Sequence, residues 1–196
     1  TREYLRDARP GSLLLNDICP EVEPYLSGLP GTPRFQFWAC DAEPLPFPKG
    51  QDLIVSCSAI QWFEHPERFL CQCKDLLKTE GYLAFSTFGP QNVREVASLT
   101  SEALPYRSLE ELRRMLSGVY QIVYSREELL HRTFSSPLDV LKHLQATGVT
   151  GIRNRKWTKG QLEDFCRRYH RQYAAPDGTV SLTYHPIYMI CKKQEQ

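Results

Sequence analysis

Polar side chains follow three apolar segments of this sequence, each at a point where a strand of an open sheet would end. They are Asp17, Asp41, Ser56 and Cys57. Ligands of an open α/β sheet bind at the carboxyl ends of its strands. An acid in such a position can accept hydrogen bonds from both hydroxyls of an adenosine ribose, so the pattern indicates a nucleotide-binding site.

The two acids also have structural interpretations. Asp17 equally suits the N-terminus of a short helix near Pro20, where the helix dipole stabilises a carboxylate. Asp41 with Ala42 can offer a carboxylate and a backbone N–H to an adenine edge, but an isolated aspartate here is more typical of a loop turn. Two acids after successive strands, with Asp52 opening a third, favour a ligand site.

The turn after the third apolar segment favours ligand binding over nucleophilic attack. Small hydroxyls, an amide and an indole suit a pocket that orients a ligand, and Ser56, Ser58, Gln61 and Trp62 supply them. Cys57 has no histidine in an obvious relation to it, and the five histidines have no metal-ligand spacing. We therefore predict neither a catalytic cysteine nor a metal site.

Apolar segments alternate with helix-like blocks in the first half of the chain. Strands are expected at Ser12–Asn16, Arg34–Trp38, Asp52–Cys57 and Gly81–Thr87, and helices at Thr1–Asp7, Cys19–Leu29 and Pro66–Leu77. This alternation predicts an α/β fold with a doubly wound, mostly parallel sheet.

The second half predicts a helical insertion before a closing strand. Helices are expected from Ser108, with a capping box to Glu111, at Ser136–Ala146 before Gly148, and at Thr158–Tyr173; Val119–Phe134 and Ser181–Lys192 are typical of strands. Pro186 indicates an edge position or a bulge in the last strand. We predict a core of residues 1–132 and 181–196 and a helical cap of residues 133–180.

Composition gives no support for nucleic-acid or membrane binding and favours a cytoplasmic protein. A net charge of +1 gives no global argument for nucleic-acid or membrane binding, and no apolar run approaches the ~20 residues of a membrane helix. An odd number of cysteines, seven, favours free thiols in a reducing cytoplasm. Residues 151–175 carry seven lysines or arginines against two acids, which suits either a solvated face or a surface that attracts an acidic partner.

Several stretches resemble class I S-adenosylmethionine-dependent methyltransferases. Asp41–Pro48 followed by Asp52–Ser56 is similar to that superfamily. Four further stretches are similar to the malonyl-acyl-carrier-protein O-methyltransferases of biotin synthesis: Ala59–Trp62, Ala84–Pro90, Pro137–Gly148 and Val180–His185. The resemblance covers essentially the whole chain and implies a Rossmann-like methyltransferase sheet, mostly parallel with an antiparallel last strand, plus a small helical cap.

The resemblance implies roles for individual residues. Asp17 would hold the ribose hydroxyls of S-adenosylmethionine with Ile18 against the adenine, Asp41 and Ala42 would read the adenine edge, and Ser56 and Cys57 would pass under the methionine portion. Substrate-side candidates are Gln61 and Trp62 around the transferred methyl group, Phe88 and Tyr184 as walls, and Lys142, Arg153 and Arg155 to hold the malonyl carboxylate. The basic cap would meet an acidic acyl carrier protein.

One part of the family pattern is not found in the sequence. These enzymes begin with a strand and a glycine-rich loop, and Thr1–Leu5 resembles the helix that follows that loop. We therefore expect the region before Thr1 to be missing from the sequence and cofactor binding by these residues alone to be poor. The alternatives are a methyltransferase for a small phenol, quinone precursor or amine, with His143 or His185 as base, and a non-catalytic domain that docks a partner.

Overall fold

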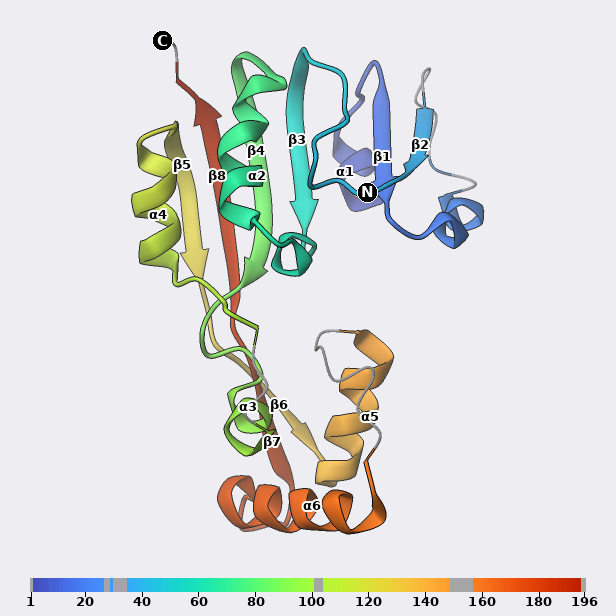
Figure 1. Cartoon of the computed structure of the whole chain (residues 1–196), viewed down its shortest axis with the longest axis vertical. Coiled ribbons are helices and arrows are strands. Elements are labelled where there is room, and N and C mark those ends of the chain that lie inside the picture. Colours follow the sequence, from blue (N-terminus) through green and yellow to red (C-terminus); the bar gives the residue numbers. More distant parts are fainter. Residues whose placement is uncertain (1, 27–28, 30–34, 101–103, 149–156, 195–196) are drawn as a thin grey trace. The chain divides into compact units, whose positions relative to one another are not determined.

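The computed structural model describes residues 2–26, 29, 35–100, 104–148 and 157–194 (Figure 1). The chain forms two compact units, Thr1–Phe47 and Pro48–Gln196. The division into a core and a cap at residues 133–180 stays a prediction.

The first unit contains a pair of parallel strands. Its elements are helix α1 (Arg2–Asp7), strand β1 (Leu13–Asp17), the 3-10 helix η1 (Pro20–Leu26) and strand β2 (Phe35–Ala39). β1 and β2 pair in register from Leu13 with Phe35 to Asp17 with Ala39, as expected for successive strands of a parallel sheet. The helix predicted after β1 is a 3-10 helix with Pro24 inside it, because proline lacks the N–H that an α-helix needs there.

The second unit is built on a four-stranded sheet. Its strands are β3 (Gln51–Cys57), β4 (Leu77–Phe88), β5 (Tyr120–Glu127) and β8 (Pro186–Lys193), in the spatial order β3-β4-β8-β5. β3 and β4 are parallel, and β8 is antiparallel to both β4 and β5. Three strands therefore run one way and the last strand of the chain runs against them, which confirms the predicted sheet.

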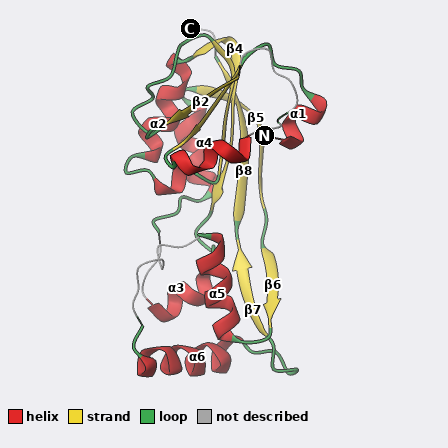
Figure 2. Cartoon of the chain, turned by 90° about the vertical axis from the view of Figure 1, so that its right-hand side faces the viewer, coloured by secondary structure: helices red, strands yellow, loops and turns green. Residues whose placement is uncertain are grey.

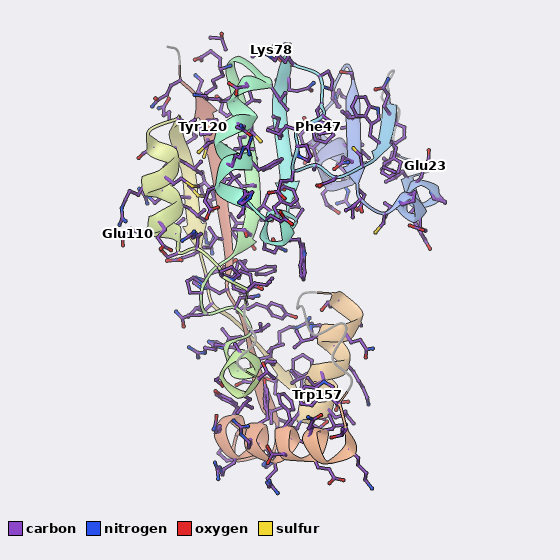
Figure 3. All side chains as sticks on the ribbon, in the orientation of Figure 1. Glu23, Phe47, Lys78, Glu110, Tyr120 and Trp157 are labelled. Carbon is purple, nitrogen blue, oxygen red and sulfur yellow. The ribbon has the colours of Figure 1, made fainter. Side chains whose placement is uncertain are left out.

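Two helices, α2 (Pro66–Gln72) and α4 (Leu109–Ser117), cover one face of this sheet (Figures 1 and 2). Leu83 and Phe85 of β4 are buried on that face, and the hydroxyl of Tyr120 on β5 donates to the backbone carbonyl of Leu70 in α2 at 2.8 Å (Figure 3). The capping box predicted for α4 is present, since Ser108 and Glu111 exchange both of its hydrogen bonds.

Some boundaries differ from the predictions. α2 ends at Gln72 and gives way to the 3-10 turns η3 (Cys73–Asp75), so β4 begins four residues before Gly81. A short 3-10 helix, η2 (Ile60–Trp62), follows β3, and the helix α3 (Arg94–Thr100) had no sequence signal that we recognised. The edge or bulge assigned to Pro186 is wrong, because β8 lies between β4 and β5; Pro186 is its first residue, where a missing N–H is tolerated.

The remaining elements of the second unit form what we call the cap lobe: α3, β6 (Leu130–Phe134), α5 (Pro137–Thr147), α6 (Lys159–Tyr173) and β7 (Val180–Tyr184). β6 and β7 are antiparallel and lie next to the three helices (Figure 2). The predicted helix stop is confirmed, since Gly148 ends α5 with a φ of 65°. Ser136 and Thr158, the first residues of the two predicted helices, are the N-caps of α5 and α6. The lobe has its own core, formed by Val93, Val96, Val140, Leu144, Phe165, Tyr169, Val180 and Leu182.

The chain leaves the sheet after β4 to form α3 of the cap lobe, and at the end of the lobe it returns to the sheet from β7 into β8. The outgoing segment (residues 89–95) and the returning segment (residues 183–186) are hydrogen-bonded to each other, and we call this region the junction. The Gly89 N–H donates to the His185 carbonyl (2.7 Å), and the His185 N–H donates to Oδ1 of Asn92 (3.2 Å). The His185 ring accepts from the Gln91 N–H at Nδ1 (3.2 Å), so Nε2 carries the ring proton and donates to Glu127 (3.0 Å).

A buried acidic side chain and close packing strengthen the junction. Glu95 is 1% exposed, and its carboxylate accepts from both the backbone N–H and the hydroxyl of Thr183. Gly89 lies against the His185 ring, where a Cβ would come within 2.5 Å of Cε1. A φ of 49° at the β-branched Val93 shows backbone strain that these contacts hold in place.

Gly89→Ala tests the close packing at the junction. We expect the free energy of unfolding to fall by about 1–3 kcal/mol, because the His185 ring or the backbone must move to admit the methyl group. Gly160→Ala is the matched control: it lies in helix α6 with nothing within 4 Å of the added Cβ, so stability should hold or rise by up to about 1 kcal/mol. Urea unfolding measures both, and equal effects would contradict the packing argument.

Candidate active site

The end of β1 carries a carboxylate with one oxygen engaged. Asp17 is half-buried; its Oδ1 accepts from the Cys19 N–H at 2.9 Å, and its backbone carbonyl accepts from the Cys40 N–H at 3.1 Å. This is the structural role considered for the residue. This role leaves Oδ2 without a hydrogen-bond partner within the described residues. Ile18, the next residue, is 70% exposed.

Asn16 joins the ends of β1 and β2, and sequence reasoning missed it. Its Nδ2 donates to the carbonyls of Trp38 (2.9 Å) and Cys40 (2.8 Å), so it fixes the chain directly before Asp41. Its only sequence signal was an amide at the end of an apolar strand. Asp41 is exposed and caps its own turn by accepting from the Glu43 N–H at 2.9 Å. The structure thus brings Asp17 and Asp41 to the same end of neighbouring parallel strands, with half-buried Ala42 beside Asp41.

The turn after β3 is held by β4. Ser58 has a φ of 50°, and its N–H donates to both the carbonyl (3.0 Å) and the hydroxyl (3.2 Å) of Ser86. Ser86 is a second residue that sequence reasoning missed, because the contact joins positions on different strands. The amide of Gln61 donates to the Ser58 carbonyl, while its Oε1 is buried without a partner among the described residues.

The other predicted residues of this turn are accessible. Ser56 is half-buried, Cys57 is exposed, and Trp62 is 47% exposed. All seven cysteines are free thiols, as predicted. Two of them lie in the core, where burial raises the pKa of Cys73 to about 12 and that of Cys191 to about 11, so both stay protonated at neutral pH.

The two predicted substrate walls belong to one aromatic cluster, which consists of Phe88, Tyr106, Phe134, His143 and Tyr184. Phe88 at the end of β4 lies 6.3 Å, between ring centroids, from both Tyr106 and Tyr184. The hydroxyl of Tyr184 lies 2.8 Å from Nε2 of His143, whose ring contacts Phe134 at 5.1 Å. Burial raises the pKa of Tyr184, so its phenol is neutral.

The structure describes only one of the three residues predicted to hold the malonyl carboxylate. Lys142 is on the exposed side of α5 and pairs with Asp139 at 3.3 Å within the same helix. Arg153 and Arg155 lie outside the described residues. Lys142 is thus the only one of the three that lies within the described residues, and its exposed ammonium is already paired with Asp139.

A shallow surface cavity of about 160 Å³ lies elsewhere, between α2 and α4. It is lined by Glu67, Arg107, Glu111, Leu112, Arg114 and Met115. Its opposite charges already satisfy one another, since Arg107 pairs with Glu67 at 2.6 Å. None of the predicted site residues lines it, so it is not the candidate site.

Comparison with known proteins identifies the family. Residues 1–85 match the profile of a family described as “Methyltransferase domain”. The whole chain is 46% identical to the malonyl-acyl-carrier-protein O-methyltransferase of Bacteroides thetaiotaomicron, of which it covers 78%, and 44% identical to that of Bacteroides helcogenes, of which it covers 76%. The chain belongs to the malonyl-acyl-carrier-protein O-methyltransferase family. Family membership confirms the resemblance inferred from the sequence motifs.

The share of a relative's length that this chain covers differs from one relative to another. The Bacteroides fragilis protein of the same name is 48% identical over 99% of this chain, but the chain spans only 39% of that protein.

Solved structures support the fold. The YcgJ protein of Bacillus subtilis aligns with 93% of the chain and 82% of its own, with a TM-score of 0.58 and 18% identity. The N-methyltransferase NodS of Bradyrhizobium japonicum, solved with S-adenosyl-L-homocysteine, aligns with 94% of the chain and 67% of its own, with a TM-score of 0.51 and 10% identity. The predicted Rossmann-like methyltransferase fold is confirmed.

His143 should make stability pH-dependent. Burial, and then the charge of Arg132, lowers its pKa below the ordinary value of 6.5. The unfolded chain therefore binds a proton more readily, and the free energy of unfolding should fall as the pH drops through about 6.5 towards the lower folded pKa. Urea unfolding at about pH 7.5 and 5.5 measures the change. His143→Gln should lose less stability between the two pH values than the wild type, and an identical loss would contradict the assignment.

Proposed function

We propose that the protein carrying this chain transfers a methyl group from S-adenosylmethionine to the free carboxylate of a malonyl thioester on acyl carrier protein, on the route to biotin. The observation that carries the proposal is the extent of the similarity. The methyltransferase-domain match ends at residue 85, whereas identity of 44–46% to the malonyl-acyl-carrier-protein O-methyltransferases runs over the whole chain, including the cap lobe. This favours the malonyl substrate over a small phenol or amine and over a non-catalytic docking domain.

The residues present at the ends of β1 and β2 fit the nucleoside part of this cofactor. Oδ2 of Asp17 is available to accept from a ribose hydroxyl, and the exposed Ile18 offers an apolar surface for adenine. We assign the adenine edge to Asp41 and the backbone N–H of Ala42, in a turn that Asn16 holds from β1. These donors and acceptors match a neutral purine and a vicinal diol.

The turn after β3, in the second unit, carries the remaining cofactor residues that the family resemblance implies. We assign Ser56 and Cys57 to the methionine portion and Gln61 and Trp62 to the space around the transferred methyl group. The support is local: Ser86 holds the strained Ser58, and the buried Oε1 of Gln61 still lacks a partner within the described residues. A ligand amine that donated to this oxygen would satisfy it.

The chemistry that the bound cofactor supplies is an electrophilic methyl group: an acceptor oxygen forms the new bond as the carbon–sulfur bond breaks, and S-adenosylhomocysteine is left. An acceptor carboxylate with a pKa near 4 is ionised at neutral pH, so it needs no general base. The chain's residues then act by holding the two reactants in line and excluding water. Phe88 and Tyr184 supply apolar walls for that purpose.

The exposed side of α6 provides a surface for the acidic carrier protein. Its inner side carries the buried Phe165 and Tyr169, and a stripe at four-residue spacing faces outward: Lys159, Glu163, Arg167 and Arg171. Three of these four side chains are positive. Opposite charges on two partners accelerate encounter and set its salt dependence. No helix within the described ranges is long and apolar enough to cross a membrane.

Methyl transfer itself is the first test. The full-length protein, given S-adenosylmethionine and malonyl acyl carrier protein, should form the malonyl methyl ester, which mass spectrometry of the carrier detects. The unmalonylated carrier is the control. Absence of the ester would end the proposal.

Asp17→Ala tests the nucleoside site. Loss of charge-assisted hydrogen bonds should weaken S-adenosylhomocysteine binding by about 1.5–3 kcal/mol in calorimetry. Asp52→Ala is the control, because Asp52 is 82% exposed in a surface pair with Lys78, so its removal should leave the affinity unchanged. An unchanged affinity in Asp17→Ala would remove Asp17 from the site.

A double charge reversal tests the carrier surface. Arg167→Glu with Arg171→Glu should raise the KM for malonyl acyl carrier protein by about tenfold and weaken its salt dependence, while the kinetics of a carrier-free malonyl thioester stay the same. Arg113→Glu with Arg114→Glu, on the exposed side of α4, is the matched control. An equal loss with both acceptors would argue against carrier docking on α6.

A further inference from the structure

Arg132 is a cation in the cap lobe that no described carboxylate neutralises. It lies in the middle of β6, its side chain is exposed, and it has no hydrogen-bond or ion-pair partner in the described parts of the chain. Three other basic residues of the lobe are paired: Lys142 with Asp139, and both Arg167 and Arg168 with Asp164. Lys159 and Arg171 lie on the exposed side of α6, away from the strands β6 and β7. Neither the composition nor the family motifs had marked Arg132.

Strand geometry places Arg132 on the side of the aromatic cluster. Side chains two residues apart on a strand share a face, so Arg132 shares its face with Phe134, which contacts the His143 ring at 5.1 Å. Across the β6–β7 pair, Leu130 is opposite Tyr184 and Arg132 is opposite Leu182, which puts Tyr184 on the same face. His131, in contrast, faces the other way and lies 3.2 Å from the Thr183 hydroxyl.

Electrostatics agree with this placement. Burial is the main cause of the pKa shifts of His143 and Tyr184, lowering the first and raising the second. The charge of Arg132 acts on both groups as a further cause, and in both it lowers the pKa. A guanidinium, a neutral imidazole and a neutral phenol are therefore close together beside Phe88 and Tyr106.

We propose that Arg132 binds the carboxylate of the acceptor, with the Tyr184 hydroxyl as a second donor, and thereby selects malonyl thioesters over neutral acyl thioesters. This inference rests on the proposed function and names its specificity residue. His143 is a positioning residue: when its Nε2–H donates to the Tyr184 oxygen, 2.8 Å away, the phenolic proton is free to point at the acceptor.

The binding mode is compatible with methyl transfer. A carboxylate offers about four lone-pair directions, so the oxygen held by Arg132 or Tyr184 retains one for the incoming methyl carbon. The carboxylate carries one negative charge before the reaction, and the ester that forms carries none. Arg132 would thus bind the substrate more tightly than the product, which favours release of the methyl ester.

Substitutions at Arg132 test the proposal in the full-length protein. With malonyl acyl carrier protein and with malonyl-coenzyme A, Arg132→Gln should lower kcat/KM by about ten- to a hundredfold, mainly through KM, and Arg132→Lys should recover part of the loss. Arg126→Gln is the matched control, because Arg126 is an exposed arginine on β5 that pairs with Glu128; its kcat/KM should stay within about twofold.

Two further measurements separate a substrate role from a structural one. Inhibition by the malonyl-coenzyme A methyl ester and calorimetric binding of S-adenosylhomocysteine should be unchanged in Arg132→Gln, since neither ligand carries the malonyl carboxylate. For His143, Gln should retain more activity than Ala, because a glutamine amide can still donate to Tyr184.

The outcomes are distinguishable. A wild type that forms no methyl ester from either thioester would end both the proposed function and the role of Arg132. A wild type that forms the ester, with Arg132→Gln equally active, would end the role of Arg132 alone. Equal weakening of the methyl ester and the malonyl thioester in Arg132→Gln would also overturn it, since a carboxylate-specific contact cannot act on the ester.

Discussion

The hydrogen bonds around His185 are the constraint on which the second unit depends. Three segments that are distant in sequence meet there: the chain leaving β4 at Gly89, the end of β5 at Glu127 and the start of β8 at Pro186. The ring has one acceptor and one donor nitrogen, and both are used within the protein. Buried polar groups that are fully paired stabilise one arrangement against its alternatives. The position of the cap lobe relative to the sheet follows from this pairing.

The junction also determines how two rings of the aromatic cluster are placed. Tyr184 directly precedes His185, and Phe88 directly precedes Gly89. The two predicted substrate walls are therefore sequence neighbours of the glycine and the histidine that pack together at the junction. α5 then adds His143 from the cap side. A small change at the junction would therefore move Phe88 and Tyr184 relative to each other.

Local signals predicted much of the fold, and non-local contacts account for what was missed. The ends of α5 and α6 were predictable because Ser136, Gly148 and Thr158 act on the turns beside them. The central position of β8 was not, because it depends on pairing with β4 and β5 rather than on Pro186 itself. Among the site residues, the strand-terminal acids were visible in the sequence. Asn16 and Ser86 were not, since each forms hydrogen bonds to another element. Arg132 was not either, since its charge acts on His143 of α5 and Tyr184 of β7, which are distant in sequence.

Asn92 shows how closely folding and recognition are joined in this protein. Its amide oxygen accepts from the backbone of His185, and its amide nitrogen donates to the Tyr106 hydroxyl at 3.3 Å, while only 2% of the residue is exposed. One side chain thus serves the junction with one atom and the aromatic cluster with another. A substitution of Asn92 would therefore remove a contact from the junction and a contact from the aromatic cluster at the same time.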